Sequence, residues 1–194
     1  MGNLSMSGKI NASIFQAVNP RTAGHNSVPL ENLRMSTVAI SVVLMFIGGS
    51  PASTAGGIKT TTFGVLLISF YNLVKGKEDV EIFGRRIMPE TTIRASAILV
   101  LSLILITICS IILSVTEEKT GYDFLEIVYE TVSAFSTVGL TRGITPSLSN
   151  AGKFILSMMM YIGRVGPMTV AYAFLKKHKN IGNYTYPEGK IIIG

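Results

Sequence analysis

The sequence of 194 residues is poor in charge and in cysteine. Only 14% of its residues are charged, where soluble domains carry about 25%, and 48% are hydrophobic, which excludes an intrinsically disordered chain. Cys109 is the one cysteine, so an internal disulfide and a cysteine metal cluster are both excluded. Residues 1–13 contain no apolar run behind a basic tip, and we expect no cleaved signal peptide.

The basic residues give a net charge of +6 but do not gather in one patch, which argues against a nucleic-acid partner. They flank apolar runs instead. One group lies between two such runs (Lys75, Lys77, Arg85, Arg86 and Arg94), and another follows the last run (Lys176, Lys177 and Lys179). The positive-inside rule places both groups on the cytoplasmic side of a membrane, with residues 117–153 outside.

Long uncharged runs are the main feature of what is present. Ala95–Thr116 holds 22 residues without a charge, and as a helix it would be about 33 Å long, enough to cross a bilayer core of about 30 Å. We therefore predict a transmembrane helix here. Phe154–Leu175 is predicted as a second span, interrupted by Arg164 and Pro167.

A third apolar region has the pattern of a broken transmembrane helix. Met35–Ile58 and Thr60–Val74 are half-length apolar pieces around the Gly/Ser/Thr-rich segment SPASTAGG. Irregular backbone at membrane depth is tolerated only where protein or a water-filled cavity surrounds it. The sequence thus predicts that residues 50–57 lie inside a protein-lined pathway.

The sequence also matches itself after a shift of 115 residues. TAG at 22–24 lies over TVG at 137–139, and MFIGG at 45–49 lies over MYIGR at 160–164. Just upstream the shift is 114, so that FQAV at 15–18 lies over YETV at 129–132. Internal repeats of this kind are common in transport folds.

Each copy begins with a short helix that ends in a Thr-x-Gly turn. In the second copy the helix is predicted at Asp123–Ser133, roughly 15–17 Å long and too short to cross. A half-membrane helix that ends in a glycine turn indicates a re-entrant pore loop, and its negative C-terminal end favours a cation. A simple turn between two helices is the alternative. The expected ion-binding carbonyls belong to Thr22, Ala23 and Gly24 in the first copy and to Ser136, Thr137, Val138 and Gly139 in the second.

Two longer segments resemble a known family. FIGGSPASTAGGIKTTTFGVLL at 46–67, and AFSTVGLTRGITPSLS with YIGRVGP within 134–167, resemble the potassium-translocating membrane subunit of bacterial Ktr-type transporters, in the Trk/Ktr/HKT superfamily. The resemblance covers essentially the whole chain. It implies an all-α integral membrane fold in which four membrane–pore-loop–membrane units surround one potassium pathway. The chain then corresponds to the C-terminal half, with two of four filter segments, and is not expected to conduct selectively alone.

The resemblance divides the chain into four parts. Residues 1–75 form the incomplete third pore unit, 76–92 a cytoplasmic connection, 93–175 the fourth pore unit and 176–194 a cytoplasmic tail. The glycine-rich stretch lies where this family has its intramembrane gating loop, and an arginine of the last span is expected to bind its carbonyls. The expected gating residues are Gly48, Gly49, Gly56, Gly57, Lys59 and Arg164.

The resemblance further implies potassium as the transported ion, with sodium coupling as an option, and no bound cofactor. The implied partners are the N-terminal half of the transporter, a second copy in a homodimer, a cytoplasmic ring of nucleotide-binding RCK subunits, and lipid. The chain would then be a multi-pass protein of the bacterial cytoplasmic membrane and not an enzyme.

Two other functions are alternatives to a potassium pathway. GGSPASTAGGIKTTT is similar to a phosphate-binding P-loop, but Ile58 breaks its spacing between Gly57 and Lys59. An alternating-access cation carrier would use the same carbonyl sites and stays open. The pair Glu117-Glu118 is expected to lie in a solvated loop, and Glu130, in the short pore helix, is expected to be either a structural group or a source of negative field.

Overall fold

The structure is a computed structural model, and it describes residues 5–25, 29–77 and 79–174. The expected cytoplasmic tail, 176–194, lies outside these residues. The elements follow one another as α1 (Met6–Val18), η1 (Leu30–Asn32), α2 (Met35–Phe46), α3 (Thr60–Val74), β1 (Glu81–Ile82), β2 (Arg85–Arg86), α4 (Pro89–Thr116), η2 (Glu118–Thr120), α5 (Phe124–Phe135), η3 (Thr145–Ser147), α6 (Asn150–Val165) and α7 (Pro167–Phe174).

Within the described residues, one helix is long and apolar enough to cross a membrane, and it is α4 with 28 residues. One side of it is exposed and aliphatic, as at Ile104, Ile108 and Ile111. The other side buries small residues, Ser102, Cys109 and Ser110, which let neighbouring helices approach closely in a membrane protein. The predicted helix over Ala95–Thr116 is confirmed, and it begins six residues earlier, at Pro89.

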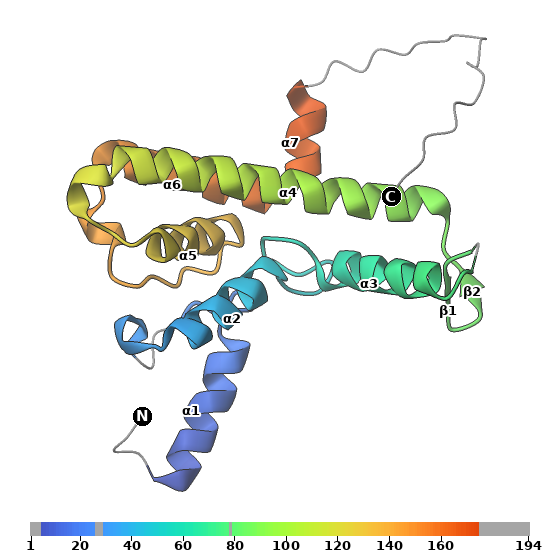
Figure 1. Cartoon of the computed structure of the whole chain (residues 1–194), viewed down its shortest axis with the longest axis horizontal. Helices are drawn as coiled ribbons and strands as arrows, with labels where there is room; N and C mark the ends of the chain where they lie inside the picture. Colours follow the sequence, from blue (N-terminus) through green and yellow to red (C-terminus); the bar gives the residue numbers. More distant parts are fainter. Residues whose placement is uncertain (1–4, 26–28, 78, 175–194) are drawn as a thin grey trace.

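The second predicted span, Phe154–Leu175, does not form one helix. α6 ends at Val165, Gly166 takes a left-handed φ of 95°, and α7 starts at Pro167 in a new direction. Figure 1 shows α7 standing away from the line shared by α4 and α6. Proline interrupts the helical hydrogen bonds and glycine supplies the turn, so the chain changes direction here.

The internal repeat predicted from the sequence is confirmed in the secondary structure. η1 and η3 begin at Leu30 and Thr145, and α2 and α6 begin at Met35 and Asn150. Both pairs are separated by the same 115 residues that separate the two Thr-x-Gly turns. The two copies therefore share one fold: short helix, turn, 3₁₀ turn and longer helix.

The two short helices differ in their packing. α5 forms the centre of the core, with Tyr129, Val132 and Phe135 buried against α2, α4 and α6. It extends two residues beyond the predicted end at Ser133. α1 projects away from the other helices (Figure 1) and leaves apolar side chains such as Ile10 and Ile14 exposed.

The glycine-rich segment separates α2 from α3, as predicted for a broken helix. After α3 the chain turns through the β1–β2 hairpin, which was not predicted from the sequence, and α4 then returns along α3 (Figure 1). Each strand has two residues, so the fold remains helical in its architecture.

Glu117 corrects another expectation, since it is not part of a solvated loop. Its side chain is buried, and its carboxylate accepts hydrogen bonds from the backbone N–H of Ser149, at 3.1 and 3.2 Å, and from the Ser149 hydroxyl. Ser149 is the N-cap of α6, where its hydroxyl accepts from Gly152 N at 3.0 Å. The end of α4 thus fixes the start of α6 through a charged side chain at the positive end of a helix.

This contact predicts unequal effects at two adjacent glutamates. Glu117→Gln should lower the free energy of unfolding by about 1.5–3 kcal/mol, because a charge-assisted hydrogen bond is lost in a buried place. Glu118→Gln is the matched control, since Glu118 is exposed, and it should change stability by less than about 0.5 kcal/mol. Thermal unfolding of the protein in detergent measures both, and equal midpoints would contradict the assignment.

Candidate ion-binding site

Both Thr-x-Gly turns contain a strained threonine. Thr22 and Thr137 have φ of 70° and 51°, and the glycines two residues on, Gly24 and Gly139, have φ of 68° and 83°. A left-handed φ costs a residue with a Cβ roughly 1–2 kcal/mol and is an outlier for a β-branched side chain. The same strain recurs at repeat-related positions, and strain of this kind is often found at ligand sites.

The two turns lie against each other. A Cβ placed on Gly24 would overlap the carbonyl oxygen of Val138, so the backbones of the two copies approach as closely as glycine allows. Ser136 and Val138 are buried and Thr137 is half-buried, while Ala23 and Gly139 are exposed. The structure therefore brings the two sets of predicted filter residues together at one place.

Each turn is stabilised by the hydrogen bonds of one polar side chain, and neither of these residues was predicted from the sequence. Asn19 Oδ1 accepts from His25 N at 2.9 Å, and its Nδ2 donates to His25 O at 2.5 Å. In the second copy the Ser133 hydroxyl donates to Leu140 O at 2.6 Å. Asn19 and Ser133 are 114 residues apart, the shift seen upstream of the turns. That shift could have identified them as equivalent polar residues at the helix ends.

The predicted gating loop is closed at its base by backbone hydrogen bonds. Gly48 N donates to Ile58 O at 2.8 Å, and Thr60 N donates to Gly49 O at 3.1 Å. Gly48 is needed there, because a Cβ on it would overlap Gly56 O. The segment between α2 and α3 is therefore a compact loop whose two ends are paired, which satisfies backbone groups that leave the helix.

The loop packs directly on the second turn. Gly56 N donates to Thr137 Oγ1 at 3.1 Å, and a Cβ on Gly56 would lie 2.8 Å from Ser136 O. A Cβ on Gly57, whose φ is 71°, would lie 2.9 Å from Ser136 Oγ. No larger residue than glycine fits at this contact without a shift of the backbone.

Two cationic side chains bind backbone carbonyls at residues 54 and 55 of the loop. Lys59 Nζ donates to Ala55 O, and Arg164 Nη1 donates to Thr54 O. Arg164 was expected from the sequence to bind carbonyls of this loop, and the structure contains such a contact. Ser53 lies beside Gly49, whose Cβ would come within 2.9 Å of Ser53 Oγ. All six predicted gating residues thus lie in the loop or touch it.

α6 reaches the same place from the other side. A Cβ on Gly163 would overlap the carbonyl oxygen of Phe135, the last residue of α5. Gly163 is the repeat partner of Gly48, and both are points of backbone contact. The end of α5 is therefore enclosed by the first turn, the loop and α6.

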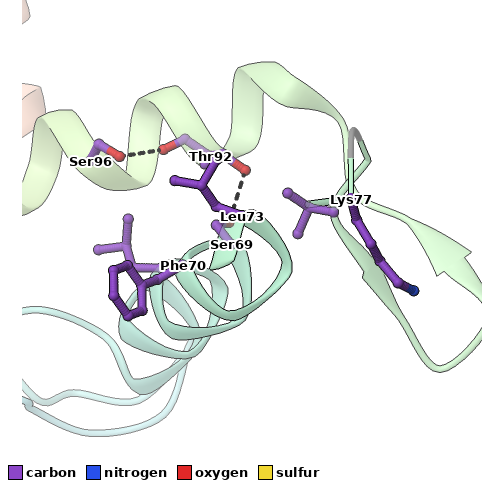
Figure 2. Close-up of a pocket in the computed structure, with 8 residues that line it drawn as sticks. Ser69, Phe70, Leu73, Lys77, Thr92 and Ser96 are labelled. Atoms are coloured by element: carbon purple, nitrogen blue, oxygen red, sulfur yellow. Dashed lines mark hydrogen bonds between the residues drawn. The ribbon is translucent and has the colours of Figure 1, made fainter. Parts of the chain in front are cut away.

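A separate pocket of about 350 Å³ lies between α3 and α4, far along α3 from the turns (Figure 2). The hydroxyls of Ser69 and Thr92, 3.3 Å apart, join the two helices at this pocket. Lys77 lies at its edge but pairs with Glu81 at 3.2 Å. The pocket thus offers an apolar surface and an already paired charge, and we assign no ligand to it.

Comparison with known proteins agrees with this geometry. The cation transport protein family TrkH matches residues 1–184 of the chain. The chain belongs to this family. A solved structure of the potassium transporter TrkH from Vibrio parahaemolyticus has the same fold, with a TM-score of 0.76 and 19% identity over 90% of this chain and 39% of that one.

Two curated relatives of this TrkH-family chain are similar along nearly its whole length. Ktr system potassium uptake protein B of Bacillus subtilis is 45% identical over 100% of the chain and 42% of the relative. Potassium/sodium uptake protein NtpJ of Enterococcus hirae is 42% identical over 94% of the chain and 41% of the relative. The chain thus spans about two-fifths of the length of these relatives. Both relatives are named as ion uptake proteins.

The fold also argues against the P-loop alternative. A P-loop follows a β-strand, whereas the segment before Gly48 is the helix α2. The glycines of this segment lie against Ser136 and against each other, so they do not form an open cradle for a phosphate.

The glycine contact of α6 with α5 predicts a large effect of one added methyl group. Gly163→Ala should lower the free energy of unfolding by about 1–3 kcal/mol, the usual cost of overpacking. Gly64→Ala, in α3, is the matched control, because a Cβ there meets nothing within 4 Å. It should be neutral or more stable by about 0.5–1 kcal/mol. Detergent-solubilised protein melting at the same temperature in both variants would refute the contact.

Proposed function

We propose that the chain supplies two of the pore units of a potassium uptake transporter, with the two Thr-x-Gly turns as quarters of its selectivity filter. The carbonyls of Thr22, Ala23 and Gly24, and those at 136–139, replace part of the hydration shell of the ion. The paired strain at Thr22 and Thr137, in turns that touch each other, is the observation that carries this proposal.

The ion is drawn to these turns by helix ends. α5 ends at Phe135, immediately before the second turn, and the C-terminus of a helix carries about half a negative charge. α1 ends at Val18, four residues before Thr22. Two helix ends therefore favour a cation at the turns without a carboxylate in direct contact. The resulting binding is weak enough for a transported ion to leave the site.

The loop at 48–57 is the proposed gate. It fits under the second turn through Gly56, and Lys59 and Arg164 bind its carbonyls. A loop with few apolar contacts and exposed tip residues, such as Pro51 and Ala52, has low local stability and can move. With Arg164 beside it, the closed loop places both backbone and positive charge in the path of a cation.

The proposed assembly contains more than this chain, which spans about two-fifths of the length of its relatives. A closed ring of carbonyls needs further units, so we propose that another polypeptide region of the same transporter covers the exposed apolar face of α1. The proposed unit divisions remain 1–75, 76–92, 93–175 and 176–194. Further proposed partners are a second copy in a homodimer, a cytoplasmic nucleotide-binding regulatory subunit and the lipid of the bacterial cytoplasmic membrane, which the protein crosses several times.

Uptake by a complete transporter tests the function. The matched region of the B. subtilis relative is replaced by this chain, and the hybrid is expressed in a bacterial strain without its own potassium uptake. We expect growth at low potassium and uptake of rubidium in preference to sodium, with sodium tested both as a competitor and as a stimulating ion. A hybrid present in the membrane that takes up no rubidium would refute the proposal.

A valine in the second filter turn should reduce selectivity. Gly139→Val forces a β-branched residue to φ of 83°, and a cost of roughly 1–2 kcal/mol corresponds to a fall of about 5–30-fold in rubidium over sodium uptake. Gly121→Val is the matched control, because Gly121 has φ of 70° and the same open surroundings but lies outside the turns. Unchanged selectivity in the Gly139 variant would remove it from the filter.

Loss of the arginine at the loop should open the pathway. Arg164→Ala frees the carbonyl of Thr54 and removes a positive charge, and we expect rubidium flux without activation to rise several-fold. Lys153→Ala is the control on the same helix, since Lys153 binds Pro146 O at 2.9 Å away from the loop. Equal basal flux in the two variants would exclude a gating role for Arg164.

A further inference from the structure

A buried carboxylate lies behind the second filter turn. Glu130, on α5, is 4% exposed, and acidic side chains are almost never so buried unless they are paired. Its Oε1 accepts from the Thr141 hydroxyl at 2.5 Å and from Arg142 N at 3.0 Å, and its Oε2 accepts from the Thr145 hydroxyl at 2.7 Å. All three donors belong to the segment that leads out of the turn.

The same face of α5 holds this segment at two more points. Glu126 and Ser133 lie four residues before and three residues after the glutamate, so the three side chains share one helix face. Ser133 donates to the carbonyl of Leu140, and Glu126 Oε1 pairs with Arg142 Nη1 at 3.3 Å. Residues 140–145, called the return segment below, are therefore attached along the helix that ends at the turn.

The first part of the turn is held by Gly24 and by the Gly56 N–H, but its last residue is not. Gly139 is exposed, and a Cβ there would meet nothing within 4 Å. The path of the chain at Gly139 therefore depends on the buried residues before it and on the return segment after it. Charge-assisted hydrogen bonds are about twice as strong as neutral ones and are stronger still in a low dielectric.

The first copy carries no such charge. The repeat aligns Gln16 with Glu130, and although Gln16 is also buried, neither of its amide atoms has a hydrogen-bond partner among the described residues. Arg142 also reaches the first copy, where its Nη2 donates to Glu31 O at 3.4 Å. The attachment at Glu130 thus fixes the second turn and, through Arg142, its distance from the first unit.

We propose that Glu130 is a positioning residue for selectivity: by holding the return segment at Thr141, Arg142 and Thr145, it fixes the carbonyls at 137–139 in the geometry that prefers potassium to sodium. The inference rests on the proposed filter function of these carbonyls. Under this proposal, Glu130 contributes to the discrimination between potassium and sodium without contacting the ion.

The hybrid transporter defined above tests the assignment, with rubidium and sodium as the probes. Glu130→Gln keeps the size of the side chain but replaces one acceptor by a donor. We expect the ratio of rubidium to sodium uptake to fall about ten-fold, as for the loss of one charge-assisted hydrogen bond. Glu130→Asp should recover part of the ratio, because it keeps the charge on a shorter side chain.

Glu117→Gln separates positioning from stability. Glu117 is equally buried, at 3% exposed, and it also binds a hydroxyl and a backbone N–H, but it acts at the start of α6. This variant should reduce the amount of transporter without changing the uptake ratio. A parallel fall of rubidium and sodium uptake in Glu130→Gln, with an unchanged ratio, would overturn the inference.

A double variant tests whether the glutamate acts through its partner. Thr145→Val should lower the ratio by itself, and Glu130→Gln with Thr145→Val should be no worse than Glu130→Gln alone, since both remove the same attachment. Independent, multiplying effects would contradict the proposal. The parent hybrid is measured first, so that a failure of potassium-like uptake, which refutes the filter function itself, is distinguished from an unchanged ratio in the variants.

Discussion

Close contact between backbones at Phe135–Val138 is the constraint on which the arrangement depends. Glycines from three different elements touch this segment: Gly24 from the first turn, Gly56 and Gly57 from the loop, and Gly163 from α6. Each position excludes even a methyl group. Irregular backbone at membrane depth must find its partners within the protein, and here the partners are other irregular or glycine-containing segments. One helix end thereby locates a turn, a loop and a long helix relative to each other.

The same contact links strain to movement. Thr137 has a φ of 51°, which is unfavourable for a β-branched residue. Such a strained conformation persists only where the surrounding contacts hold the backbone in place. One of those surroundings is the loop, whose Gly56 N–H donates to the Thr137 hydroxyl. Moving the loop removes a support of the turn, so that in the proposed mechanism the filter and the gate are not independent parts.

The sequence predicted the features that depend on local chemistry and on repetition. The span at α4, the broken helix at 35–74 and the repeat followed from apolar runs, glycines and self-similarity. The separation of α7 from α6 did not, because an interrupted apolar run has the same composition whether the chain bends or continues. Glu117 was wrongly expected in a solvated loop, and for Glu130 the sequence left a structural role and a source of negative field as alternatives. Burial of a carboxylate depends on donors 32 residues away at Ser149 and 11 to 15 residues away in the return segment.

The charged side chains near the two filter turns differ from those near the gating loop. Behind the second turn Glu126 pairs with the guanidinium of Arg142, and Glu130 accepts hydrogen bonds from two hydroxyls and from the backbone N–H of Arg142. At the loop Lys59 and Arg164 donate to the carbonyls of Ala55 and Thr54, and within the part of the chain that the structure describes neither forms an ion pair. Interactions between charges are weakly screened away from water, so in the proposed mechanism a cation is favoured at the turns and opposed at the loop. Selection and closure would then depend on different residues, and Thr137 would connect them through its hydrogen bond with Gly56.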